Sequence, residues 1–410
     1  MADFIMAAQN GRTIPKEDKI FGISRRANEM IEERGADAVV NATIGTLLDD
    51  DGDLMVLSSV DDTFMGLEPE EYAGYAPIGG IPAFRKAAVK AAFGKYEPKG
   101  YVEAVASPGG TGAIRNIISN YSCPGDKILT SDWHWSPYGT IASEIGRSVD
   151  TYQMFTEDRR YNAEGLCDKA KQLLESQDRL VIIINTPAHN PTGYALTNED
   201  WERVVKLLSY IPPEKRIALL IDTAYIDFAG DEDKYREFFP ILETLPANIL
   251  PVMAYSMSKT FTIYGMRCGA AICLAPTKEI ADEFRRVCEF SSRGSWSNCA
   301  KSGQSIIANI YENEDLLKKV TEERKEIREM LLKRGKAFEE EANRVGLEIV
   351  PFDAGFFVSI PCDNPDEVSA KLEKEGIFLV PLAKGLRVSV ASIPEEKCRR
   401  IPVKILEAMK

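Results

Sequence analysis

Residues 180–193 read Leu-Val-Ile-Ile-Ile-Asn-Thr-Pro-Ala-His-Asn-Pro-Thr-Gly. The first five form a short apolar run with many β-branched side chains, which is typical of a strand buried on both faces. Similar runs occur at 217–221, 250–254 and 268–274, and longer helical patterns lie among them. Such strands build mostly parallel sheets with helices on both faces, so the sequence predicts an α/β fold.

Two helical patterns and a change of organisation follow along the chain. Residues 198–209 start with an N-cap candidate, Asn198, and carry an apolar stripe, as expected of a helix that crosses between parallel strands. Residues 313–345 mix apolar residues at helical spacing with many charges and no proline, which predicts one long exposed helix. Strands are expected over 347–352 and 386–390, with a helix over 365–375. This order predicts a smaller α/β unit, with a domain boundary near residues 315–320.

Composition limits the class of protein. The chain has 410 residues, 50 of them basic and 63 acidic, so its net charge is −13. That sign repels phosphate backbones and disfavours nucleic acid as a partner. No apolar run approaches the roughly 18 residues that a membrane span needs, and residues 1–10 lack the basic region of a signal peptide. We therefore expect a soluble protein with no membrane partner.

Cysteine and histidine usage narrows the chemistry further. The eight cysteines are scattered, without a Cys-x-x-Cys pair, so we expect reduced thiols and a cytoplasmic location. The only histidines are His134 and His189, which argues against a zinc site built on several imidazoles. The acidic run at 49–53 lacks the alternating ligands and final glutamate of an EF-hand loop, so we interpret it as a turn and predict no metal site.

Polar side chains follow the apolar runs, where an open parallel sheet binds its ligands. Asn190 lies in the loop after the first run, Asp222 and Tyr225 follow the second, and Lys259 follows the third. Each alone is a common turn, cap or surface residue. Their conjunction predicts one site that combines an amide, a carboxylate, a phenol and an amine.

With further motifs, this arrangement resembles the class I aminotransferases, fold-type I enzymes that use pyridoxal 5′-phosphate (PLP) and are typified by aspartate and aromatic aminotransferases. The resemblance extends from residue 41 to residue 387. Its motifs are Tyr75-Ala-Pro-Ile-Gly-Gly80-Ile-Pro, Ser107-Pro-Gly-Gly110-Thr111-Gly112, His189-Asn190-Pro-Thr-Gly193, Asp222-Thr-Ala-Tyr225, Ser256-Met-Ser258-Lys259 and Arg267-Cys-Gly269. We predict a large PLP-binding domain over 51–317, a small domain over 15–50 and 318–410, and an N-terminal arm over 1–14.

The residue types match what PLP requires. The cofactor needs a lysine amine of lowered pKa that is both nucleophile and proton carrier, and Lys259 is the candidate. The resemblance implies that Asp222 keeps the pyridine nitrogen protonated, so that the ring accepts electrons when the substrate loses its α-proton. It also implies that Tyr225 and Asn190 hydrogen-bond the phenolic oxygen.

The phosphate group of PLP needs donors and positive charge. Gly110 and Thr111 are expected to open a helix after a strand near 102–106, so that backbone N–H groups and the helix dipole face the anion. The glycine pattern lacks the third glycine of a dinucleotide-binding loop, which disfavours a nicotinamide site. The resemblance adds hydroxyl and guanidinium ligands from Ser256, Ser258, Arg267 and, across a homodimer interface, Tyr75.

Substrate contacts also follow from the resemblance. Arg387 aligns with the arginine that binds the substrate α-carboxylate, a bidentate task that suits a planar guanidinium. Gly45 and Asn190 are expected to lie beside the substrate. Trp135 aligns with the aromatic residue that stacks on the cofactor ring, although Trp133 competes for this role.

Arg293 is the candidate for reading the substrate side chain. The segment Arg293-Gly-Ser-Trp296-Ser297-Asn298 aligns with a family segment whose arginine crosses the dimer interface to the distal carboxylate of aspartate or glutamate. Trp296 stands where tyrosine is usual, and the prolines that normally follow Asn298 are missing. A second interpretation therefore stays open, in which Arg293 lies in an ordinary loop between helices.

We predict a homodimeric PLP-dependent aminotransferase that moves an amino group between an L-amino acid, with aspartate, glutamate or aromatic residues favoured, and a 2-oxo acid. A cystathionine-type β-lyase on the same scaffold is the alternative, because the cofactor supplies the difficult chemistry. That lyase would release ammonia and pyruvate without an oxo-acid acceptor. A PLP-binding transcription regulator would need a basic helix-turn-helix module, and the residues before Asn41 are too few and not basic enough.

Overall fold

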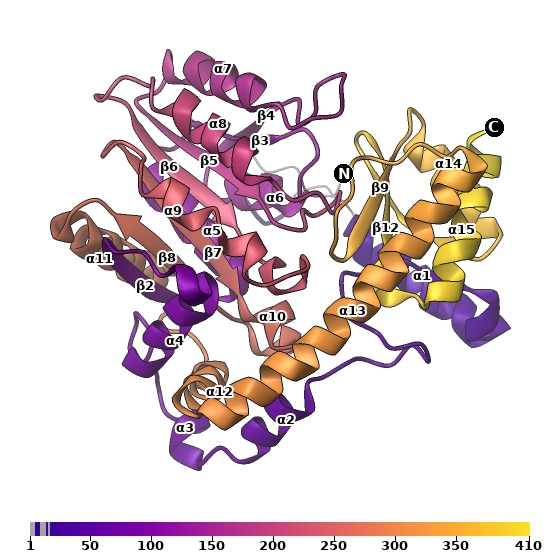
Figure 1. Ribbon diagram of the computed structural model, residues 1–410, viewed down its shortest axis with the longest axis horizontal. Coiled ribbons are helices and arrows are strands. Elements are labelled where there is room, and N and C mark those ends of the chain that lie inside the picture. The colour runs from indigo at the N-terminus through magenta and orange to yellow at the C-terminus, as the bar shows by residue number, and fades with distance from the viewer. Residues whose placement is uncertain (1–4, 9–13, 15–16) are drawn as a thin grey trace.

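The computed structural model describes residues 5–8, 14 and 17–410. A seven-stranded sheet forms the centre of the larger of two lobes, with the strand order β2-β8-β7-β6-β5-β3-β4 (Figure 1). Every neighbouring pair is parallel except the two that β8 forms. The predicted α/β fold is confirmed. The strands are β2 (Tyr101–Pro108), β3 (Lys127–Ser131), β4 (Ser148–Tyr152), β5 (Arg179–Asn185), β6 (Arg216–Asp222), β7 (Ile249–Ser256) and β8 (Cys268–Ala275).

Helices cover both faces of this sheet. In β5, Leu180, Ile182 and Ile184 pack with α4, α7 and α8, while Val181 and Ile183 pack with α5, α6 and α11. Because neighbouring residues of a strand face opposite sides, a strand covered twice is apolar at every position. The helices of this lobe are α2 (Ser58–Met65), α3 (Pro69–Ala73), α4 (Pro82–Phe93), α5 (Gly109–Tyr121), α6 (Pro137–Glu144), α7 (Ala163–Leu174), α8 (Asn198–Leu208), α9 (Phe239–Leu242), α10 (Met257–Thr260), α11 (Lys278–Ser295) and α12 (Lys301–Glu312).

The smaller lobe combines segments from both ends of the chain. The long helix α13 (Glu314–Val345) extends to it from the larger lobe (Figure 1). Its strands form an antiparallel sheet of order β11-β12-β9 and a parallel pair β1-β10. The elements are α1 (Lys19–Arg34), β1 (Val40–Asn41), β9 (Phe357–Pro361), α14 (Pro365–Lys374), β10 (Ile377–Phe378), β11 (Val380–Leu382), β12 (Gly385–Ser389) and α15 (Glu395–Met409).

Two predictions around α13 were wrong in part. Residues 347–352 form no strand. Val350 donates its N–H to the carbonyl of Ser359, but Pro351 has no N–H with which to continue a ladder. The helix itself forms as predicted, yet nine of its residues are buried, so it is not exposed all round.

Two turns also bear on the sequence predictions. The N-cap of α8 is Thr197 instead of Asn198, because the Thr197 hydroxyl and the Asp200 carboxylate each accept the other residue's backbone N–H. Residues 49–53 form the expected turn, with Gly52 at φ 91°.

The predicted arm over 1–14 lies outside the described residues except for 5–8 and 14. Within the described ranges, no helix is both long and apolar enough to cross a bilayer.

Candidate active site

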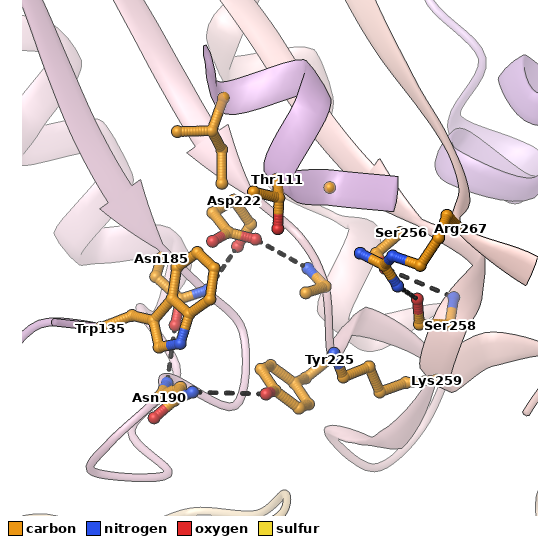
Figure 2. A pocket seen from close by; sticks show the side chains of 13 residues that line it. Thr111, Trp135, Asn185, Asn190, Asp222, Tyr225, Ser256, Ser258, Lys259 and Arg267 are labelled. Atoms are coloured by element: carbon orange, nitrogen blue, oxygen red, sulfur yellow. Dashed lines mark hydrogen bonds between the residues drawn. The ribbon is translucent and has the colours of Figure 1, made fainter. Parts of the chain in front are cut away.

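A cavity of about 160 Å³ lies at the carboxyl ends of β5, β6 and β7 (Figure 2). Asn185 and Asp222 are paired at the ends of β5 and β6, so the polar residues that end these strands meet at one edge of the sheet. The cavity is lined by Gly110, Thr111, Ile114, Trp135, Asn185, Asn190, Asp222, Ala224, Tyr225, Ser256, Ser258, Lys259 and Arg267. Of the residues predicted to bind the cofactor, only Tyr75 is missing from this lining.

Lys259 supplies the amine of the site. It lies on α10, directly after β7. Burial lowers the pKa of its amine to about 8, with Asp222 opposing the shift and Arg267 adding to it. The rings of Tyr225 and Tyr264 are centred 5.4 and 5.9 Å from Nζ. The lowered pKa makes the neutral amine available near physiological pH, as a nucleophile or proton carrier requires.

Asp222 ends β6 as a buried carboxylate. Tyr138 donates its hydroxyl to Oδ2 at 2.6 Å, and the Ala224 N–H donates to Oδ1 at 3.2 Å. Burial raises the pKa of Asp222, although both hydrogen bonds and Lys259 oppose the shift. A buried carboxylate is stabilised most strongly by a cationic N–H donor, and a protonated pyridine nitrogen is such a donor.

Asn190 joins Tyr225 to Arg387 beside the cavity. Its Nδ2 donates to the Tyr225 hydroxyl at 3.4 Å, and its Oδ1 accepts from Arg387 Nη1 at 3.2 Å. Arg387 Nη2 donates to the carbonyl of Thr43 at 2.6 Å. Arg387 is 4% exposed, its Nε has no partner, and burial lowers its pKa to about 10 against the effect of Tyr225. No carboxylate in the described ranges pairs with this buried cation, so it favours an anionic ligand.

Another part of the cavity collects groups that bind anions (Figure 2). Helix α5 begins here, and no side chain caps its first N–H groups. A Cβ on Gly110 would lie only 3.3 Å from Cβ of Ser256, so glycine keeps this corner open. Arg267 Nη1 donates to the Ser258 hydroxyl at 3.3 Å. Backbone donors, hydroxyls and a guanidinium together fit a phosphate group.

The donor set as a whole fits PLP. An amine, a carboxylate, an amide with a phenol and an anion cradle line one cavity, and these are the partners that the groups of PLP need. Trp135 lines the cavity, whereas its competitor Trp133 belongs to the apolar core. Within residues 5–8, 14 and 17–410, no group of three or more His, Cys, Asp or Glu side chains could hold a metal ion.

The family model for class I and II aminotransferases matches residues 37–405. The chain belongs to this family. It is therefore an aminotransferase, which moves an amino group between an amino acid and a 2-oxo acid, and its family is PLP-dependent. This result favours the predicted transamination over the alternative lyase.

Individual proteins agree with the family assignment. The mitochondrial aspartate aminotransferase of Schizosaccharomyces pombe is 30% identical over 303 residues, which cover 72% of this chain and 66% of that protein. The crystal structure of an aminotransferase from Anaerococcus prevotii matches with a TM-score of 0.96 and 38% identity over 99% of this chain and 100% of that chain. An aromatic-amino-acid aminotransferase from Burkholderia pseudomallei, solved covalently bound to pyridoxal phosphate, shares the fold with a TM-score of 0.78 and 23% identity over 99% and 100% of the two chains.

Four predicted site residues of the aminotransferase lie outside the cavity lining. Arg387 is joined to it by the hydrogen bond described above. Gly45 packs against Phe357, whose Cζ would lie 2.5 Å from an added Cβ. Tyr75 is 91% exposed, and Arg293 is exposed in the last turn of α11. Neither Tyr75 nor Arg293 lines the cavity of its own chain.

Sequence reasoning missed several residues of the aminotransferase site. Asn185 Oδ1 accepts the N–H of Asn190 at 2.6 Å, and its Nδ2 donates to the carbonyl of Asp222 at 2.7 Å. It directly follows the run 180–184, so the rule of inspecting strand ends could have found it. Nothing local in the sequence indicates the contact of Tyr138 with Asp222.

Proposed function

We propose that this aminotransferase binds PLP through Lys259 and exchanges amino groups between an L-amino acid, with aspartate, glutamate and aromatic residues favoured, and a 2-oxo acid. One observation carries the proposal. Lys259 and Asp222 line one cavity, and Arg387 is hydrogen-bonded to Asn190 of the same lining. None of the three forms an ion pair in the part of the chain that the structure describes. The amine of Lys259 can react with the aldehyde of PLP, and the carboxylate of Asp222 can pair with its pyridinium. The guanidinium of Arg387 can bind the α-carboxylate of the substrate.

The proposed cofactor contacts follow from the lining. Asp222 would accept the pyridine N–H, Tyr225 and Asn190 would donate to the phenolic oxygen, and Trp135 would stack on the ring. The hydrogen bond of Tyr138 supports this assignment, because it orients Asp222 without neutralising it. The phosphate would be held by Gly110, Thr111, Ser256, Ser258, Arg267 and, from a second subunit, Tyr75.

Bound PLP supplies an electrophilic carbon and a ring that withdraws electrons from the substrate α-carbon. Arg387 would bind the α-carboxylate with its planar fork, beside Gly45 and Asn190, and so orient the α-proton. Lys259 Nζ would remove that proton and carry it, because burial lowers the pKa of its amine to about 8 and so favours the neutral form that accepts a proton. Burial of the site limits competing reactions with water.

A homodimer with shared active sites is part of the proposal. Tyr75 and Arg293 are exposed, and Asn298 Nδ2 donates to the carbonyl of Ala76 at 2.9 Å. This bond joins the segment of Tyr75 to the segment that follows Arg293, which supports the proposal that a second subunit covers both residues. Arg293 donates to the Ser297 hydroxyl at 2.5 Å and pairs with no described carboxylate, which leaves its charge for the distal carboxylate of aspartate or glutamate.

The remaining proposals concern organisation and location. The seven-stranded sheet lies within 101–275 and the smaller sheets within 40–41 and 357–389, which supports domains over 51–317 and over 15–50 with 318–410. All eight cysteines are free and six are buried, which supports a reducing, cytoplasmic location.

Half-reactions test the function most simply. The purified enzyme is incubated with each of twenty amino acids without an oxo acid, and the absorbance of the cofactor is followed. We expect aspartate, glutamate or aromatic residues to convert it fastest, and Lys259→Ala to bind PLP without turnover. A parallel reaction contains an added 2-oxo acid. Release of ammonia and pyruvate there, with no new amino acid formed, would overturn the proposal.

A further inference from the structure

A buried ionic cluster contacts the two segments that carry Tyr225 and Lys259. Its centre is Asp227, which is 1% exposed and follows Tyr225 by two residues. One of its partners is Thr260, which immediately follows Lys259 and ends α10. The cluster therefore touches both catalytic segments without lining the cavity.

Both oxygens of the Asp227 carboxylate accept hydrogen bonds. Its Oδ1 accepts from Arg236 Nη2 at 2.7 Å, with Arg324 Nη1 of α13 at 3.6 Å. Its Oδ2 accepts from the Thr260 hydroxyl at 2.6 Å and from the Tyr255 hydroxyl at 2.9 Å. Burial alone would raise the pKa of Asp227, but the two arginines and the hydrogen bonds lower it to about 2. Asp227 is therefore an anion at neutral pH, and its hydrogen bonds fix its orientation.

Helix α10 needs such an external anchor. It has four residues, and a helix of one turn is not stable through its own hydrogen bonds. Its rotation sets where the side chain of Lys259 points. The Thr260 hydroxyl is the group of this helix that reaches Asp227, and Asp227 is held by Arg236, which also donates to the carbonyls of Ala91 and Ala92.

We propose that Thr260 and Asp227 are positioning residues for transamination. The hydrogen bond from the Thr260 hydroxyl to the Asp227 carboxylate holds α10 in place, and α10 in turn directs the Lys259 amine into the cavity beside Tyr225. This inference rests on the proposed role of Lys259. The carboxylate reaches no reacting atom and acts only through the lysine that it orients. The cluster also includes Arg324, so the anchor is continuous with the helix that leads to the smaller lobe.

Two matched variants separate positioning from stability. Thr260→Val keeps the shape of the side chain and removes the hydroxyl that anchors α10. Tyr255→Phe removes a hydrogen bond to the same Asp227 oxygen, but from β7, and serves as the control. Thr260→Ser restores the hydroxyl, and Thr260→Ala replaces the valine variant if that one does not fold.

The first measurement uses the apoenzyme, in which the pKa of the Lys259 amine is obtained from the pH dependence of its reductive methylation, mapped by mass spectrometry. We expect Thr260→Val to shift the midpoint from about 8 toward 10.5, the ordinary lysine value. We also expect kcat to fall by about 10- to 100-fold, since small misplacements of a catalytic group have effects of this size, with KM within about twofold. Tyr255→Phe should lower Tm to a similar extent with neither change, and Thr260→Ser should recover both values.

Equal kinetics and equal amine pKa values in the valine and phenylalanine variants would overturn the inference, as would a wild-type amine pKa in Thr260→Val. The proposed function fails separately. A wild-type enzyme that transaminates no amino acid contradicts it, whereas the amine pKa of the apoenzyme still tests the anchor.

Discussion

Replacing Arg387 with methionine should separate substrate binding from stability. The guanidinium is 4% exposed with one unpartnered nitrogen and no described carboxylate partner, so its burial is a cost that a substrate carboxylate offsets. A charge-assisted bidentate contact contributes about 1.5–3 kcal/mol, which corresponds to a loss of about 10- to 150-fold in kcat/KM. Methionine has a comparable length and removes the buried charge, while Asn190 Oδ1 and the Thr43 carbonyl each lose a donor. These effects oppose each other, so we expect Tm of the apoenzyme to change little.

Steady-state kinetics with an acidic, an aromatic and an aliphatic amino acid measure the first effect, and thermal unfolding of the apoenzyme measures the second. Every amino acid should lose a similar factor, because the α-carboxylate is common to all. Arg387→Lys is the control, since it keeps the charge but loses the fork. A loss confined to one class of side chain would show that Arg387 reads the side chain, and a large fall in Tm would refute the view that its burial is costly.

Three further predictions follow from the same site. Asp222→Asn should lower kcat by at least about 100-fold with PLP still bound, because fixed charge that stabilises the transition state has this effect; an unchanged kcat would mean that Asp222 does not hold the ring nitrogen. Arg293→Ala should reduce kcat/KM for aspartate and glutamate by about one to three decades and spare aromatic substrates. A mixed dimer of Arg293→Ala and Lys259→Ala chains should keep dicarboxylate activity, and finding it as poor as the Arg293→Ala homodimer would refute the shared site. Because the pKa of Lys259 is about 8 folded and 10.5 as a free side chain, the unfolded chain binds more protons between these values. The free energy of unfolding of the apoenzyme should therefore rise by more from pH 8 to 10.5 than that of Lys259→Met, and parallel pH profiles would contradict the lowered pKa.

The sequence predicted those parts of the fold that depend on local patterns. The apolar runs became β5 to β8 because burial on two faces requires an apolar side chain at every position. Residues 347–352 carry a similar pattern but form no strand, since strand formation also needs partners, and Pro351 interrupts the pairing. The sequence predicts Asn198 as the N-cap of α8. The cap is its neighbour Thr197, because Thr197 and Asp200 exchange reciprocal hydrogen bonds.

The candidate site could be predicted where its residues end strands, as Asp222 does, or follow them closely, as Lys259 does, because the topology of a parallel sheet brings those ends together. Contacts between distant segments could not be predicted in this way. The bond of Tyr138 to Asp222 spans 84 positions, and that of Thr260 to Asp227 spans 33. Both depend on how loops and short helices pack, which no periodicity in the sequence records.

Borohydride reduction of the purified holoenzyme, followed by peptide mapping, tests the central claim most directly. A lysine joined covalently to PLP is fixed by reduction to a stable amine. The account predicts one pyridoxyl group per chain, attached to Lys259. A pyridoxyl group on any other lysine, or on none, would contradict it.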